Sequence, residues 1–146
     1  MSTPTLPHTW RPRRTRIYCY AIGLLAMVVT GIVAILLPHD GASAWNVWSR
    51  LGVFAFGVAI AAFLSRHAGV HITADENGLE VVNLFQRHRL PWGSVLAVRL
   101  RRGDPWAYLD LSDGETIAAM GIQASDGEAA PAAARQLARL IHERSA

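Results

Sequence analysis

The sequence predicts an α+β fold in which a hairpin of two transmembrane helices precedes a mostly β domain that ends in one helix. Two observations predict it. The stretch from Ile17 to Leu64 contains only two charged residues, Asp40 and Arg50, so it is more apolar than a globular core requires. From Val70 onward, short alternating segments are separated by turn residues, as in antiparallel sheets. We therefore divide the chain into a basic N-terminal cytoplasmic segment (1–16), a helical hairpin (17–66) and a β domain (70–146).

The first predicted helix covers residues 17–37. This stretch carries no charge and ends at Pro38. At about 1.5 Å per residue it spans roughly 30 Å, the thickness of the hydrocarbon core of a bilayer. Tyr18 and Tyr20, at its start, are expected in the aromatic belt of the membrane interface, where a ring with a polar tip is stable.

The second predicted helix covers residues 45–65 and depends more on its flanks. The uncharged apolar run from Leu51 to Leu64 is too short to span a bilayer alone. Trp45 and Trp48 extend it as interface residues, and Arg50 is expected to reach back to the headgroups with its guanidinium group. The alternative for Arg50 is a functional charge inside the membrane.

The connection between the helices, residues 38–44, is short, so the helices are expected to be antiparallel neighbours. Small residues recur every four positions and predict close approach of the two backbones. They are Ala26, Thr30 and Ala34 on the first helix, and Gly57 and Ala61 on the second. Homo-oligomerisation through the helices is left open by the same pattern.

The distribution of arginine predicts the orientation. Four arginines precede the first helix and Arg66 follows the second, whereas the loop between the helices carries no Lys or Arg. By the positive-inside rule both termini are cytoplasmic, in the plasma membrane. A cleaved signal peptide is the alternative, with Ala42-Ser43-Ala44 as its cleavage site, but a signal peptide has a shorter apolar region. The four arginines are Arg11, Arg13, Arg14 and Arg16.

Turn chemistry marks two hairpins in the β domain. Asn77-Gly78 and Asp113-Gly114 tolerate positive φ, so residues 70–73 are expected to pair with 79–85, and 106–111 with 116–120. Pro91 predicts an edge or a bend between strands at 87–90 and 94–100. In the second of these strands, the alternation puts Leu96, Val98 and Leu100 on the apolar face.

The chain closes with one helix after Ser125-Asp126-Gly127-Glu128, which has the spacing of a capping box. An apolar stripe on this helix is expected to cover the open end of the sheet. The stripe consists of Ala133, Ala134, Leu137, Leu140 and Ile141.

Three segments carry a resemblance to a known family: Ile-Thr-Ala-Asp-Glu-Asn-Gly-Leu at 72–79, Arg-Leu-Pro-Trp at 89–92 and Arg-Arg-Gly-Asp-Pro-Trp-Ala at 101–107. With the preceding helical hairpin, they resemble the bacterial PH domain of the actinobacterial low-molecular-weight protein antigen 6 type, over about residues 70–141. The resemblance implies a PH-like fold, in which a strongly bent antiparallel sheet forms a partly open barrel capped by a C-terminal helix. It implies little about activity.

An arginine-rich set is the candidate surface for an anion, a lipid or a partner. Two successive strands are expected to bring its members together, and guanidinium groups suit phosphate or carboxylate. A plain solvated face, neutralised by nearby carboxylates, is the alternative. Trp92 and Trp106 are candidates for an exposed aromatic partner surface, with core packing as their alternative. The set consists of Arg87, Arg89, Arg99, Arg101 and Arg102.

Other classes of function are disfavoured. The charge from Arg66 onward is about neutral, which argues against a nucleic-acid binder. The histidines lack metal-ligand spacing, and we find no cofactor motif or catalytic constellation. We expect a non-enzymatic interaction or scaffolding module at the cytoplasmic face of the membrane, in cell-envelope processes, with the lipid bilayer and an unidentified protein as partners. The alternatives are recognition of anionic lipid headgroups and an accessory-subunit role through the helices.

Overall fold

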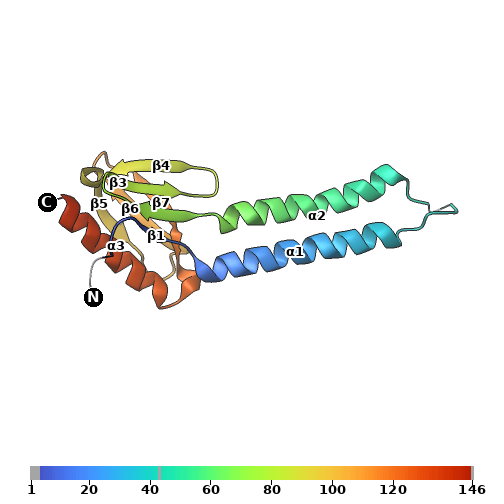
Figure 1. Cartoon of the computed structure of the whole chain (residues 1–146), viewed down its shortest axis with the longest axis horizontal. Helices are drawn as coiled ribbons and strands as arrows, with labels where there is room; N and C mark the ends of the chain where they lie inside the picture. Colours follow the sequence, from blue (N-terminus) through green and yellow to red (C-terminus); the bar gives the residue numbers. More distant parts are fainter. Residues whose placement is uncertain (1–3, 43, 146) are drawn as a thin grey trace. The chain divides into compact units, whose positions relative to one another are not determined.

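The computed structural model describes residues 4–42 and 44–145, and it contains the two long helices that the sequence predicts. Helix α1 covers Arg13–Leu36 and helix α2 covers Val47–Ala68 (Figure 1). Both are long and apolar enough to cross a membrane. Helix α2 begins after Trp45 because Asn46 caps it: the Asn46 side-chain oxygen accepts a hydrogen bond from the Ser49 amide at 2.8 Å.

The chain folds as two compact units. Residues 16–68 form the helical hairpin. The residues before position 16 join those from position 69 onward in the second unit, which holds the strands and the C-terminal helix. The second unit is therefore built from two stretches of sequence that the hairpin separates.

Small residues pack the two helices of the hairpin against each other. Gly57 lies so close to α1 that a methyl group there would collide with Thr30 Oγ1 and would lie 3.0 Å from the carbonyl oxygen of Ala26. A methyl group on Gly23 would lie 3.3 Å from Ala61 Cα. The predicted contact between these small-residue faces is confirmed, and Gly23 extends it by one further position.

The strands of the second unit form two antiparallel sheets, with the orders β1-β2-β3-β4 and β5-β6-β7. The two predicted hairpins are confirmed as β2–β3 and β6–β7. No strand pairing joins the sheets within the described residues, so they do not close into a barrel. The bounds are β1 His8–Trp10, β2 His71–Ala74, β3 Gly78–Val82, β4 Arg87–Pro91, β5 Val95–Arg99, β6 Trp106–Leu111 and β7 Thr116–Gln123.

Strand β1 precedes the hairpin in sequence, yet it pairs with β2, which follows the hairpin. His8 lies opposite Ala74, and Trp10 lies opposite Ile72. A strand of three residues has too little periodicity to detect from the sequence, so β1 is not among the predicted strands. The helical hairpin is thus inserted between two neighbouring strands of one sheet.

Helix α3, Ala129–Ser145, completes the core of this unit. It packs against β5 and β7, and Figure 1 shows it beside the strands, running obliquely to β3 and β4 in this view. Leu137, Leu140 and Ile141 are buried together with Trp10, which lies in the same core. The predicted apolar stripe of the helix is confirmed, and it covers residues of both sheets.

Two predictions about the middle strands were wrong. Strands β4 and β5 lie in different sheets, so they do not bring their arginines together as adjacent strands. The bend predicted at Pro91 is confirmed, because a 3-10 turn at Trp92–Ser94 leads the chain into the second sheet. The second wrong prediction concerns Leu96, which is exposed and does not lie on the apolar face of β5. An irregularity between Val95 and Ala97 shifts the register, so Val95 is buried instead.

The predicted capping box was also wrong. Helix α3 begins at Ala129, and Ser125 and Asp126 lie in a preceding 3-10 turn. Their side chains bind the segment at the start of α1 instead of capping α3.

Candidate functional site

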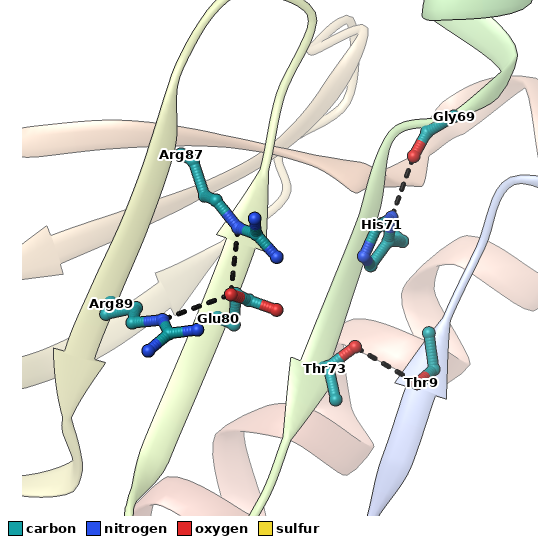
Figure 2. Close-up of polar contacts among 7 residues, drawn as sticks. All are labelled: Thr9, Gly69, His71, Thr73, Glu80, Arg87 and Arg89. Atoms are coloured by element: carbon teal, nitrogen blue, oxygen red, sulfur yellow. Dashed lines mark hydrogen bonds and ion pairs between the residues drawn. The ribbon is translucent and has the colours of Figure 1, made fainter.

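The outer face of the first sheet carries Arg89 on β4, directly opposite Glu80 on β3, and Arg87 two residues before Arg89 on the same strand (Figure 2). Arg87 Nε lies 2.8 Å and Arg89 Nε 3.2 Å from Glu80 Oε1. The hydrogen bond from Arg87 is the largest cause that lowers the pKa of Glu80, followed by that from Arg89. Two guanidinium groups share one carboxylate, so this face carries an excess of positive charge, and both arginines are largely exposed.

Arg99 on β5 forms the tightest ion pair of the second sheet. Its Nε lies 2.6 Å from Asp110 Oδ2, and its Nη2 lies 2.8 Å from Asp110 Oδ1, so the carboxylate is bound by both arms of the guanidinium fork. The Thr116 hydroxyl donates a third hydrogen bond to Asp110 at 2.8 Å. These contacts lower the pKa of Asp110 and raise the pKa of Arg99. Arg99 thus connects neighbouring strands and has fewer donors left for a ligand.

Arg101 and Arg102 lie in the turn between β5 and β6 and are exposed. The Asp104 carboxylate accepts a hydrogen bond from the backbone amide of Arg101 at 2.8 Å, which closes this turn. A hollow of about 380 Å³ separates the turn from the start of α3, with Gly127 and Ala130 on the helix side. These two arginines border a concave surface beside the turn, and Arg89 of the predicted set borders another hollow, of about 300 Å³, on the first sheet.

The five predicted arginines therefore occupy three places: the first sheet, the second sheet and a turn. Trp92 requires a correction as a surface residue, because its ring is 7% exposed and lies in the core, as the core-packing alternative expects. Trp106, at the start of β6, is partly buried. No local sequence pattern indicates that β4 and β5 lie in separate sheets, and this separation is why the five predicted arginines do not form one surface.

Side chains at the end of β7 and just after it bind the first turn of α1. The amides of Arg13 and Arg14 donate to Asp126 Oδ2 at 3.1 Å and Oδ1 at 2.9 Å, and Thr15 Oγ1 donates to Gln123 Oε1 at 2.6 Å. The first amides of a helix have no partner within the helix, and a carboxylate there also meets the positive end of the helix dipole. Asp126 is thus a helix cap supplied by a distant segment, which local sequence analysis could not detect.

Arg50 has partners within the hairpin. Its Nε donates to the Ala34 carbonyl at 2.8 Å, and its Nη2 donates to the Ile35 carbonyl at 3.0 Å. Both carbonyls belong to the last turn of α1, where backbone oxygens lack helical partners and a positive charge is favoured. Arg50 therefore connects the two helices beside the loop, and its reach to lipid headgroups stays a prediction.

The other residues predicted at the membrane interface lie on exposed surface. The rings of Tyr18, Tyr20, Trp45 and Trp48 are exposed, as are Arg11, Arg13, Arg14 and Arg66, whereas Arg16 is partly buried. Their roles at the interface and in setting the orientation stay predictions. Within residues 4–42 and 44–145, no three His, Cys, Asp or Glu side chains gather into a group that could hold a metal ion.

Comparison with known proteins identifies the family. A model of the bacterial PH domain matches residues 69–140. Uncharacterized proteins of Mycobacterium tuberculosis and Mycobacterium bovis are 31% identical over 133 residues, which cover 87% of this chain and 86% of each relative. The chain belongs to the bacterial PH domain family. The family resemblance stated from the sequence is thus confirmed, and the likeness to the mycobacterial proteins extends from this bacterial PH domain into the helical hairpin. No solved structure matches the chain.

Strand β1 lies outside the segment that the family model matches. Trp10 is nevertheless 6% exposed and part of the core, and its indole Nε1 donates to Gln136 Oε1 on α3 at 3.0 Å. In this bacterial PH domain, the matched segment is therefore completed by a strand from the other side of the hairpin. The local signal for this strand is the alternation that places apolar Leu6 and Trp10 on the same side as His8, and it is too weak to interpret alone.

Proposed function

We propose that this bacterial PH domain protein is a non-enzymatic interaction or scaffolding module, anchored by its helical hairpin at the cytoplasmic face of the plasma membrane. The observation that carries the proposal is the pairing of β1 with β2 across the hairpin. Because β1 precedes the hairpin and β2 follows it, the domain is tethered to the hairpin by two segments of chain, which suits a module that acts at one fixed surface.

The same pairing supports an even number of membrane crossings. The segments that enter α1 and leave α2 are neighbours in one sheet, so they lie on the same side of a bilayer. Signal-peptide cleavage at Ala42-Ser43-Ala44 would remove Trp10 from the core, which argues against that alternative; residue 43 itself lies outside the described residues. The arginines at both ends of the hairpin favour the cytoplasmic side.

Cysteine accessibility tests the location. In a Cys19→Ser background, Thr5→Cys reports on the N-terminal segment and Ser112→Cys on the β6–β7 turn, both at exposed positions. A maleimide that cannot cross membranes is expected to label neither cysteine in intact cells and both after permeabilisation. If both cysteines are labelled when only the envelope layer outside the plasma membrane is permeabilised, the domain lies outside the plasma membrane and the proposal is refuted.

The proposed partner is a protein, and affinity purification of the full chain in mild detergent tests this. We expect the same protein to be recovered repeatedly with the wild-type chain. Repeated recovery of the chain alone would contradict a scaffolding role.

Recognition of anionic lipid is a second candidate, favoured by the exposed Arg101 and Arg102 beside the hollow at the start of α3. Native mass spectrometry of the detergent-extracted chain measures lipid retention. If these arginines hold a phosphate headgroup, the variant carrying Arg101→Gln and Arg102→Gln should lose bound anionic phospholipid. Equal retention by the wild type and the variant would contradict this candidate.

A further inference from the structure

The turn between β3 and β4 presents an apolar tip to solvent. Residues 83–86 read Asn-Leu-Phe-Gln, and the side chain of Phe85 is 73% exposed. A single exposed apolar side chain is ordinary on a protein surface. Two further features, the rigidity of this turn and its place in the sheet, distinguish Phe85.

The turn is held rigidly at its base. The Asn83 amide donates to the Gln86 carbonyl at 2.8 Å, which closes the turn. The Asn83 side chain then fixes the turn to β7: its Nδ2 donates to the Ala118 carbonyl at 2.7 Å, and its Oδ1 accepts from the Met120 amide at 3.1 Å. Phe85 is therefore displayed by a fixed backbone, which keeps the entropic cost of any contact low.

The strand register places this turn at the end of the sheet where the chain continues into the helices. Val82 pairs with His71 on one side and with Arg87 on the other, so residues 83–86 extend past His71. Helix α2 ends at Ala68, only a few residues before His71. Figure 2 shows Arg87, at the base of the turn, and Gly69 toward the same end of the sheet.

We propose that Phe85 inserts into the boundary between headgroups and acyl chains of the bilayer that α1 and α2 cross, giving the domain a third membrane contact. This inference rests on the proposed membrane anchoring. An aromatic ring suits that boundary, and Arg87, two residues further on, keeps its guanidinium group among the headgroups. Because the exposed ring of Phe85 supplies the contact, the contact is apolar in origin and forms on neutral lipid, and Glu80 offsets part of the charge of Arg87 and Arg89.

The full chain reconstituted in phosphatidylcholine vesicles tests the contact. In a Cys19→Ser background, an environment-sensitive fluorophore is attached to Phe85→Cys or to the control Ser112→Cys. Ser112 lies in the turn between β6 and β7, and Gln123 is at the other end of β7. Lipids with a nitroxide high on the acyl chain should reduce fluorescence at position 85 at least about twofold and leave position 112 within about 10%.

A second pair of variants removes the effect of the fluorophore's own apolar surface. The label is moved to Gln86→Cys, with Phe85 either retained or replaced by Phe85→Ser. Quenching at position 86 should be present with Phe85 and should fall with Phe85→Ser, since the native ring then no longer holds the turn in the lipid.

The outcomes separate this inference from the anchoring on which it rests. Absence of quenching at positions 85 and 86, in a chain that resists alkaline carbonate extraction, would overturn the Phe85 contact and leave the anchoring intact. Release of the chain by carbonate would overturn the anchoring itself. Quenching that requires anionic lipid would overturn the apolar origin of the contact.

Discussion

Truncation of Trp10 tests whether β1 is an integral part of the PH-like domain. The ring is 6% exposed, lies in the core cluster, and donates a hydrogen bond to Gln136 on α3. Replacing a buried tryptophan by alanine costs about 3–5 kcal/mol, through the lost burial of the ring and the cavity left behind. Gln136 is partly exposed, so water replaces the lost donor and the hydrogen bond adds little. We expect Trp10→Ala to reduce the free energy of unfolding by about 3–5 kcal/mol.

Amide hydrogen exchange in nanodiscs measures this loss. Because about 1.4 kcal/mol corresponds to a factor of ten, exchange of the most protected amides in β2 and β3 should accelerate by roughly 10² to 4 × 10³-fold. Thr9→Ala is the matched control: Thr9 is the neighbouring residue on the opposite face, exposed, with one hydroxyl contact to Thr73 at 3.1 Å. We expect the control to change stability by within about 0.5 kcal/mol. Equal exchange in the two variants would refute the assignment of β1 to the core.

Three further predictions concern single contacts. Gly57→Val should destabilise the hairpin by about 1–3 kcal/mol through its collision with Thr30, whereas Gly52→Val, with open space around it on the same helix, should not. The packing of α1 on α2 is measured by the yield of a disulfide between Gly23→Cys and Ala61→Cys in a Cys19→Ser background. Equal disulfide yields in the Gly57→Val and Gly52→Val variants would contradict the close contact at Gly57. Arg50→Met should weaken the hairpin by about 1.5–3 kcal/mol, because the carbonyls of Ala34 and Ile35 lose a charged donor, and Arg50→Lys should retain part of that stability. Faster amide exchange at the end of α1 measures the loss, and unchanged exchange would show that Arg50 does not stabilise the contact between the helices. Asp110 has a pKa lowered by Arg99 and Thr116, so its stabilising effect is full above the ordinary carboxyl range and is lost as pH falls through the folded-state pKa. Unfolding midpoints measured from neutral to acid pH should fall less steeply for Asp110→Asn than for the wild type, and identical profiles would show that the pair does not contribute.

The features predicted correctly from the sequence depend on local patterns. The length of the apolar runs determines α1 and α2, and Asn77-Gly78 and Asp113-Gly114 determine where the β2–β3 and β6–β7 hairpins turn. The spacing of small residues predicted the contact at Gly57. Each of these signals lies within a few residues of the structure it determines.

The features that were missed depend on distant partners. Strand β1 is recognisable only by its pairing with β2, which lies beyond two helices in the sequence. Ser125 and Asp126 have the composition of a local cap, but they bind the start of α1 because the fold brings it within reach. The irregularity that exposes Leu96 and the separation of β4 from β5 also follow from how the sheets form, and these two features decide which arginines lie together.

The insertion of the hairpin between β1 and β2 has a consequence for how the protein is made. The ribosome releases β1 first, and its partner strand follows only after both apolar helices have left the tunnel. Closing so long a connection in a flexible chain carries an entropic cost that grows with its length. Packing of α1 on α2 through Gly23, Gly57 and their partners shortens the effective connection, since it brings the two ends of the hairpin together. Packing of the two helices thus precedes completion of the sheet, and a chain whose helices fail to pack is left with an unpaired edge at β2.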